Sequence, residues 1–274
     1  MIDYPDWYKT PQVKFRMIQF TYNRETMFIK KEDNRGGATT RMLRIHNLNS
    51  FFVWSKRLNM FKLNREYNLY YSLAKYKNGI PYTTLDMKNR DFSDWNNNHW
   101  KEMESYDFLL DIDAGSHSDI MFAHYSAWNI KNRFDDLNVP YHLRFSGRGF
   151  HFVMPFACFG FQEGDVSFNP DDKENIYFVF MNIAMELHNR YSEMVDTSIY
   201  DSRRVTKIPY SLALYDGRNY VCASFSSDEE FENFNLKDMR PYAKYHEVSS
   251  VNKWKEHLFN PKGNVFKLLN ELGV

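Results

Sequence analysis

The chain has 274 residues, enough for one large domain or two small ones, and its 35 basic and 35 acidic residues give a formal net charge of zero. Because a non-specific nucleic-acid binder is usually basic, any contact with nucleic acid must come from a local patch of charge. The two cysteines, Cys158 and Cys222, exclude a disulfide framework and a cysteine-rich zinc site.

The first third of the chain predicts strands, a loop and a helix. Residues 13–31 alternate well enough to predict a β-hairpin, and the Gly-, Thr- and charge-rich residues 31–40 predict an exposed loop. Residues 49–61 predict a helix, whereas residues 67–76 fit either a strand or a helix.

The central block has a clearer pattern. Residues 107–113 predict a strand, and residues 118–137 have helical periodicity that stops before a proline. Residues 141–145 and 150–156 predict two strands joined by a Ser-Gly-Arg-Gly turn, and residues 172–194 predict a second helix. This order indicates a mixed α/β fold of the α+β kind, and the tail becomes helical again near "VFKLLNEL".

Nothing in the sequence indicates export or a membrane. The N-terminal residues lack the features of a signal peptide, and the longest apolar run, residues 150–161, is too short to span a bilayer. We therefore expect a cytoplasmic or nucleoid-associated protein that is not secreted and has no membrane partner.

Two acids end the first central strand. Side chains alternate faces along a strand, so Asp111 and Asp113 are predicted to point the same way, while Phe108, Leu110 and Ile112 fill the core on the opposite face. Two adjacent carboxylates repel each other unless a cation lies between them. On its own the pair fits both a metal site and a core strand that happens to carry acids.

The glycine turn "RFSGRGFHF" at residues 144–152 is more informative. Gly147 and Gly149 permit a tight turn whose backbone N–H groups can approach an anion. Ser146, Arg148 and His151 are predicted to gather around it, and these donors suit a triphosphate. The alternative is a hairpin turn with a solvated arginine.

A third acid and further cations follow the second helix. Asp196 could join the first two acids, although an isolated aspartate is also common in turns. Arg204 and Lys207 lie three residues apart, and Ser211 follows. Three acids from two separate elements, beside clustered cations, are typical of two-metal phosphoryl or nucleotidyl transfer.

Together these motifs resemble the archaeo-eukaryotic primase superfamily, and in particular the archaeal-type DNA primase small (catalytic) subunit. The resemblance covers roughly residues 14–215. It rests on "YYSLAKY", "LLDIDAG", "FSGRGFH", "VDT" and "DSRRVTKIPYSL", which follow one another in the family's order.

The resemblance implies a primase-type catalytic core, with mixed sheets flanked by helices, that makes short primers on a single-stranded DNA template during DNA replication. Asp111, Asp113 and Asp196 would be catalytic carboxylates that hold two Mg²⁺ or Mn²⁺ ions. The nucleotide-binding residues, for NTP or dNTP substrates, would be Ser146, Gly147, Arg148, Gly149, His151, Arg204, Lys207 and Ser211. A primase large subunit or a replicative helicase is an optional partner.

The sequence also departs from the family. Residues 152–195 contain one cysteine and one histidine, so the zinc module that members usually carry there is absent and no zinc is expected. Ala213 replaces a histidine that often follows "SL", and Gly115 replaces a frequent acid. These departures favour a mobile-element or minimal primase-polymerase over a cellular replicative subunit.

We expect residues 1–274 to form one catalytic domain, with the core motifs in 100–215 and a partly helical extension in 216–274. Two alternatives remain open: a primer-extending repair polymerase, like the end-joining ligase polymerase domain, and a non-catalytic nucleotide- or DNA-binding module. A replication-initiator nuclease is disfavoured because His151 is not part of a His-x-His pair.

Overall fold

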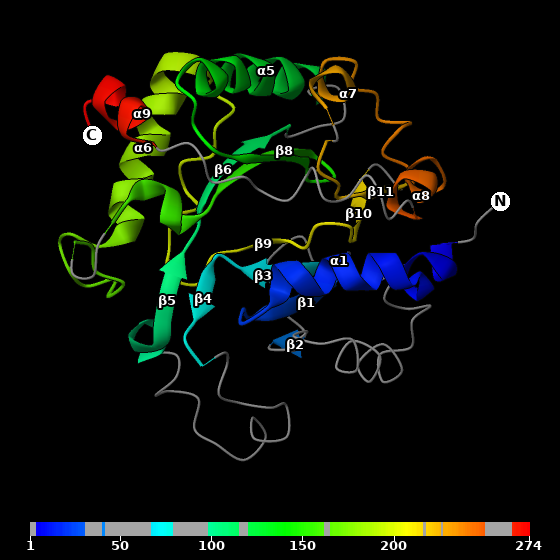
Figure 1. Ribbon diagram of the computed structural model, residues 1–274, viewed down its shortest axis with the longest axis horizontal. Coiled ribbons are helices and arrows are strands. Elements are labelled where there is room, and N and C mark those ends of the chain that lie inside the picture. The colour runs from blue at the N-terminus through cyan, green and yellow to red at the C-terminus, as the bar shows by residue number, and fades with distance from the viewer. Residues whose placement is uncertain are drawn as a thin grey trace.

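The computed structural model describes residues 4–30, 40–41, 67–78, 98–114, 120–161, 165–215, 218–225, 227–249 and 265–274. This part of the chain consists of helices and small antiparallel sheets, so the predicted mixed α/β class is confirmed. The two largest sheets lie one above the other (Figure 1).

The upper sheet is antiparallel, and its strands are, in spatial order, β6 (Phe108–Asp113), β8 (Gly149–Met154) and β7 (His142–Phe145). The helix α5 (Ile120–Asp136) covers one face of this sheet (Figure 1). Leu110 and Phe152 are paired across the two strands and are fully buried, and the ring of Phe152 meets Phe134 of α5 at 5.4 Å. The predicted core face of β6 is therefore confirmed.

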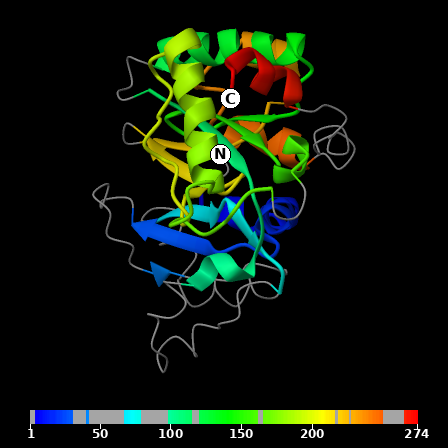
Figure 2. The same cartoon turned by 90° about the vertical axis from the view of Figure 1, so that its left-hand side faces the viewer.

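Two further helices lie beside α5: α6 (Ile176–Tyr191) and α9 (Phe266–Leu272), and Figure 2 shows them from the side. The side chain of Asn175 caps α6 by accepting a hydrogen bond from the backbone N–H of Phe178 at 2.9 Å. The ring of Phe180 then packs edge-on against Phe108 at 5.1 Å. This contact fixes α6 against the beginning of β6.

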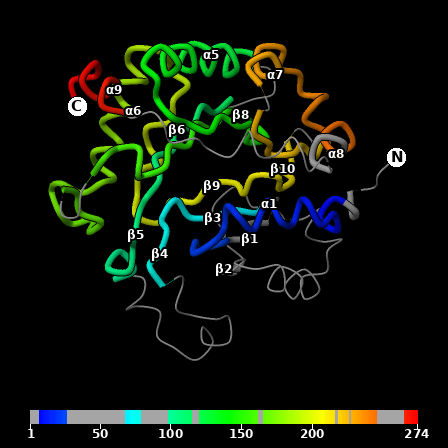
Figure 3. The backbone as a smooth tube through the Cα atoms, viewed as in Figure 1, coloured from blue at the N-terminus to red at the C-terminus, as the bar shows by residue number. Residues whose placement is uncertain are grey.

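The lower sheet is also antiparallel, and its strands are, in spatial order, β2 (Thr40–Arg41), β1 (Thr26–Lys30), β3 (Tyr67–Ser72) and β9 (Val205–Lys207). As the edge strand, β9 faces the upper sheet; the tube in Figure 3 shows it running between the two levels. Residues 67–72 are thus a strand, which resolves the ambiguity in the sequence.

The hairpin predicted over residues 13–31 is wrong in its first half. Residues Pro11–Thr21 form the helix α1, and only Thr26–Lys30 form a strand. Val13, Met17 and Thr21 recur every fourth residue and are all buried, so one helical face packs on a second apolar core that contains Trp7 and Tyr8.

The remaining elements are η1 (Tyr4–Lys9), β4 (Ala74–Tyr76), η3 (His99–Glu102), β5 (Met103–Tyr106), η5 (Phe156–Phe159), β10 (Leu212–Tyr215), β11 (Arg218–Val221), α7 (Asp228–Glu232) and α8 (Pro241–Ser249). The helical tail is confirmed. The helix expected over residues 49–61 and nearly all of the loop expected over 31–40 lie outside the described residues. No helix in the described ranges has the length and apolarity needed to cross a membrane.

Candidate active site

The backbone segments that carry the three predicted acids lie side by side at one edge of the upper sheet. Residues 194–196 run alongside β6 as a short antiparallel extension, with Ile112 and Val195 as bridge partners. The backbone N–H of Asp196 donates to the carbonyl oxygen of Asp111 at 2.9 Å, and that of Asp113 donates to the carbonyl of Met194 at 3.2 Å. The structure therefore places the backbone of Asp196 next to the D-x-D pair, although 82 or more residues separate them in sequence.

Asp111 is paired with His151. The two residues are direct partners across β6 and β8, and the ring Nε2 lies 3.2 Å from the carboxylate Oδ1. Burial opposes ionisation of Asp111, but the hydrogen bond from His151 and the charges of Arg204 and Lys207 outweigh it and lower the pKa of the carboxyl. Asp111 is therefore charged at neutral pH.

The other ring nitrogen of His151 faces the lower sheet. Its Nδ1 lies 3.1 Å from the hydroxyl of Thr206 on β9. The same hydroxyl accepts a hydrogen bond from Arg144 Nη2 at 2.9 Å, and Arg144 Nη1 donates to the hydroxyl of Tyr71 at 3.2 Å. Burial, with the nearby positive charge of Arg144 and Lys207, lowers the pKa of His151, so the ring is neutral.

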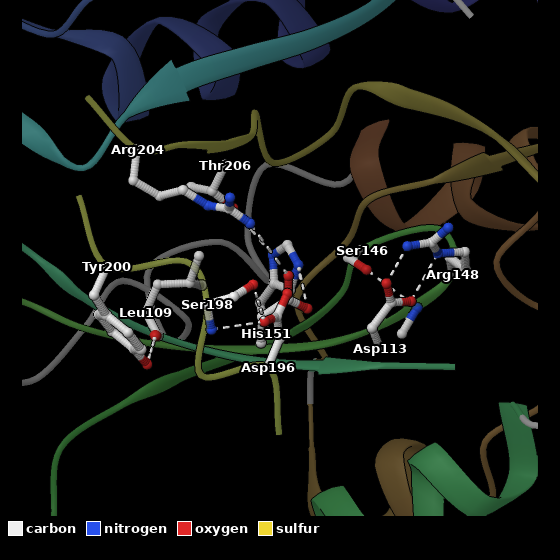
Figure 4. Close-up of polar contacts among 12 residues, drawn as sticks. Leu109, Asp113, Ser146, Arg148, His151, Asp196, Ser198, Tyr200, Arg204 and Thr206 are labelled. Atoms are coloured by element: carbon white, nitrogen blue, oxygen red, sulfur yellow. Dashed lines mark hydrogen bonds and ion pairs between the residues drawn. The ribbon is translucent and has the colours of Figure 1, made fainter. Parts of the chain in front are cut away.

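These contacts involve two residues that the sequence did not single out, Thr206 and Tyr71, and one, Arg144, that it did not predict at the site. Thr206 is opposite Tyr71 in the β3–β9 pair, and no short-range pattern indicates this. The one local signal is that Arg144 on β7 lies two residues before Ser146, so that the two side chains are expected on the same face. Figure 4 shows Thr206 beside the His151 ring.

The glycine turn is closed by Ser146 and Gly149. The backbone N–H of Ser146 donates to the carbonyl of Gly149 at 2.9 Å, and the N–H of Gly149 donates to the Ser146 hydroxyl at 3.1 Å. Gly147 has a left-handed φ of 101°, and a Cβ there would lie 2.3 Å from the Cβ of Ala213. A Cβ on Gly149 would lie 2.0 Å from the carbonyl oxygen of Ile112. Both positions therefore require glycine.

Arg148 points at the acids rather than into solvent. Its Nε lies 2.7 Å from Asp113 Oδ1, and its Nη2 pairs with Oδ2, which makes a two-point ion pair (Figure 4). The side chains are 48% and 30% exposed. The predicted gathering of Ser146, Arg148 and His151 at the turn is thus observed, with Arg148 and His151 each bound to a carboxylate.

Two more cations lie near the acids. Arg204 Nη2 is 4.0 Å from Asp111 Oδ2, and the buried Nε of Arg204 has no hydrogen-bond partner within the described part of the chain. Lys207 Nζ lies 3.4 Å from the position that a Cβ on Gly147 would take, so the ammonium group lies against the turn. Positive charge therefore surrounds the acids on the side facing the lower sheet.

Ser211 is placed differently from the other predicted residues. It is fully buried, and its Oγ has no hydrogen-bond partner among the residues that the structure describes. Its carbonyl accepts from the N–H of Cys222, whose sulfur lies 3.2 Å from the carbonyl of Ser146. Ser211 thus lies behind the turn.

The carboxylate of Asp196 is held by its own loop. Its Oδ1 accepts hydrogen bonds from the backbone N–H and the hydroxyl of Ser198, at 2.9 and 2.6 Å. The hydroxyl of Tyr200 connects this loop to β6 by donating a hydrogen bond to the carbonyl oxygen of Leu109 at 2.7 Å (Figure 4).

The donor set can be compared with the needs of a divalent metal. Within the described residues, no group of three His, Cys, Asp or Glu side chains is arranged to hold a metal ion. Each carboxylate is instead engaged by a protein group: Asp111 by His151, Asp113 by Arg148, and Asp196 by Ser198. The chemical type of these donors nevertheless suits Mg²⁺ and Mn²⁺, because three carboxylates on adjacent backbone segments supply the hard oxygen ligands that these ions prefer.

Comparison with known proteins supports the fold. No protein-family model and no curated protein matches the chain. Among solved structures, the chain is similar to the polymerase domain from Mycobacterium tuberculosis ligase D in complex with DNA. The similarity covers 98% of this chain and 91% of that one, with a TM-score of 0.54 and 13% sequence identity.

This likeness agrees with the primase-polymerase core that the sequence predicts. The neighbour is a ligase polymerase domain, the type of protein that the sequence left open as an alternative, and it is not a primase small subunit.

Proposed function

We propose that the chain is a nucleotidyltransferase of the primase-polymerase type, acting on a single-stranded DNA template. The observation that carries this proposal is that the backbone segments bearing Asp111, Asp113 and Asp196 lie side by side at one edge of the upper sheet, directly beside the glycine turn. The fold shared with a polymerase domain that was solved in complex with DNA supports it.

The proposed reaction is attack of a 3′-hydroxyl oxygen on the α-phosphorus of a nucleoside triphosphate. The bond from that phosphorus to the bridging oxygen breaks, pyrophosphate leaves, and the hydroxyl proton passes to water. Asp111, Asp113 and Asp196 would hold two Mg²⁺ or Mn²⁺ ions, which when bound favour ionisation of the hydroxyl and offset charge on the leaving group.

The side chains near the turn would bind the triphosphate. Lys207 and Arg204 would supply positive charge where negative charge accumulates during the reaction, since Arg204 lies beside Asp111 and Lys207 lies against the glycine turn. Arg148 would move from Asp113 to a phosphate, because its fork suits either group. The full proposed set also includes Ser146, Gly147, Gly149, His151 and Ser211.

For the finer activity, we propose synthesis of primers without a pre-existing end, because the motifs match the primase small subunit in order and spacing. Extension of existing primers is the second candidate, which the likeness to a ligase polymerase domain favours. A primase large subunit or a replicative helicase is proposed as an optional partner.

The test is a synthesis assay on single-stranded DNA with labelled NTPs or dNTPs and Mg²⁺ or Mn²⁺, with and without a primer. Unprimed products support primase activity, and products formed only from a primer support the second candidate. Asp196→Asn, which preserves shape and removes charge, should abolish both. Products that persist in an Asp111→Asn/Asp113→Asn variant would contradict the metal ligands, and nucleotide binding without synthesis would indicate a non-catalytic module.

A further inference from the structure

A chain of buried side chains links the lower sheet to the acids on the upper sheet. It runs from Tyr71 on β3 and Arg144 on β7 through Thr206 on β9 and His151 on β8 to Asp111 on β6. This hydrogen-bonded series thus contains one residue from each of five strands. Each contact in it is between 2.9 and 3.2 Å long.

The donors in this hydrogen-bonded series can be assigned an order that starts from Arg144. A guanidinium can only donate, so the Thr206 hydroxyl accepts from Arg144 and keeps its single proton for another partner. The nearest such partner is Nδ1 of His151, at 3.1 Å. With Nδ1 as the acceptor, the ring carries its proton on Nε2, which donates to Asp111 Oδ1 at 3.2 Å.

Burial makes each link costly to lose. Arg144 and Thr206 are each 2% exposed and His151 is 6% exposed, so water cannot readily replace a missing partner. Thr206 is also held rigidly, because its backbone pairs with Tyr71 in the β3–β9 ladder and its branched side chain has few rotamers.

From this geometry we infer that Thr206 is a positioning residue for the metal-binding carboxylate of Asp111. Its hydroxyl sets the tautomer and the orientation of His151, and the ring in turn holds Asp111 in one rotamer. Arg144 acts behind it by orienting the hydroxyl. This inference rests on the proposed function, since it takes Asp111 to be a metal ligand. Hydrogen-bond partners of ligand groups commonly tune metal affinity in this way.

The first test measures Mn²⁺ binding to the full chain without nucleotide, from the electron paramagnetic resonance signal of free Mn²⁺. Thr206→Val keeps the shape and loses the hydroxyl, so we expect binding roughly tenfold weaker or more. Thr206→Ser keeps the hydroxyl and should bind within about twofold of wild type. Valine and serine variants that bind Mn²⁺ equally, with equal thermal unfolding, would overturn the inference.

Asp111→Asn separates this inference from the proposed function. If Asp111→Asn weakens Mn²⁺ binding and Thr206→Val does not, the metal assignment stands and the positioning role is wrong. If Asp111→Asn has no effect, the proposed function itself fails.

A second measurement uses the wild-type protein and so does not depend on whether a variant folds. Imidazole ¹⁵N chemical shifts of wild-type protein report which nitrogen of His151 carries the proton. We expect the proton on Nε2 and Nδ1 as the acceptor, and a ring protonated at Nδ1 would overturn the inference.

Discussion

Arg148 in the glycine turn pairs with Asp113 on β6 through two guanidinium nitrogens, Nε to Oδ1 and Nη2 to Oδ2. Arg148 is predicted to bind phosphate and Asp113 to bind a metal ion, but in the structure the two side chains form an ion pair with each other. A metal ion and Arg148 cannot share the same carboxylate oxygens, so metal binding at Asp113 must compete with this ion pair.

Removal of Arg148 should therefore change the affinities for Mn²⁺ and for the nucleoside triphosphate in opposite directions. In Arg148→Ala we expect Mn²⁺ alone to bind several-fold more tightly, because Asp113 loses its competitor. The triphosphate should bind roughly tenfold or more weakly, because a charge-assisted hydrogen bond contributes about 1.5–3 kcal/mol. Titration of Mn²⁺ and of nucleotide by calorimetry measures both. Arg148→Lys retains charge without the fork and should fall between wild type and alanine; weaker Mn²⁺ binding in Arg148→Ala would contradict the competition.

The glycine turn offers a test of stability. Gly147→Ala combines a left-handed φ of 101° with a Cβ 2.3 Å from that of Ala213, so we expect a loss of about 2–4 kcal/mol in the free energy of unfolding. Gly273→Ala is a matched control, since its φ is 75° and nothing lies within 4 Å of the added Cβ. It should cost about 1 kcal/mol. Urea denaturation checks both values, and equal losses would show that the contact with Ala213 is unimportant.

A buried ion pair joins Asp107, the residue directly before β6, to the N-terminal part of the chain. Arg24 Nη2 lies 2.6 Å from Asp107 Oδ2, and the two side chains are 13% and 10% exposed. Arg24 also donates to the carbonyl of Leu73 at 2.6 Å. In Asp107→Asn, the arginine remains buried with no charged partner at Asp107, and we expect a loss of about 3 kcal/mol in the free energy of unfolding.

The control for this prediction is the exposed pair of Lys75 and Glu104, whose side chains are 34% and 45% exposed. Glu104→Gln should change the free energy of unfolding by less than about 0.5 kcal/mol, because exposed ion pairs contribute little. Chemical denaturation of both variants makes the comparison, and an Asp107→Asn variant as stable as Glu104→Gln would refute the role given to Arg24.

Stability should fall in mild acid. Burial, together with the charge of Arg144, lowers the pKa of His142 from 6.5 to about 4. The unfolded chain therefore takes up a proton near pH 6.5 that the folded chain takes up only near pH 4, so unfolding binds a proton within this window. We expect the free energy of unfolding to drop by about 2–3 kcal/mol from this group between those two pH values.

Denaturation at a series of pH values tests this expectation. The slope should be shallower in His142→Gln. An unchanged slope in that variant would assign the acid sensitivity to other buried groups, such as His151, whose pKa is also lowered by burial.

The sequence predicted the parts of the site that depend on local pattern. Alternation along β6 placed Asp111 and Asp113 on one face and Leu110 in the core, and the two glycines marked the turn. These features depend on neighbours a few residues away. The position of the Asp196 backbone beside Asp111 could be predicted only through the family resemblance, because no short-range rule reports which segment extends the edge of β6.

The parts that the sequence missed depend on pairing between distant strands. Thr206 acquires its role because β9 is an edge strand next to β3 and faces His151, which lies 55 residues earlier in the chain. Helix α1 was missed because a segment with buried residues at Val13 and Met17 also contains enough alternation to fit a strand. In both cases the outcome depends on tertiary packing, which the local sequence pattern does not report.

The route from Tyr71 to Asp111 also has a consequence for biosynthesis. It uses strands that begin at Tyr67 and end at Lys207, so closure of the site requires loops spanning more than 130 residues. A chain emerging from the ribosome cannot complete the network before Thr206 has been made, whatever helices have already formed. Loop closure over such distances is slow compared with helix formation. Orientation of the His151 ring by Thr206 is therefore a late event in folding, and until then Asp111 is paired with a ring that lacks the hydroxyl behind it.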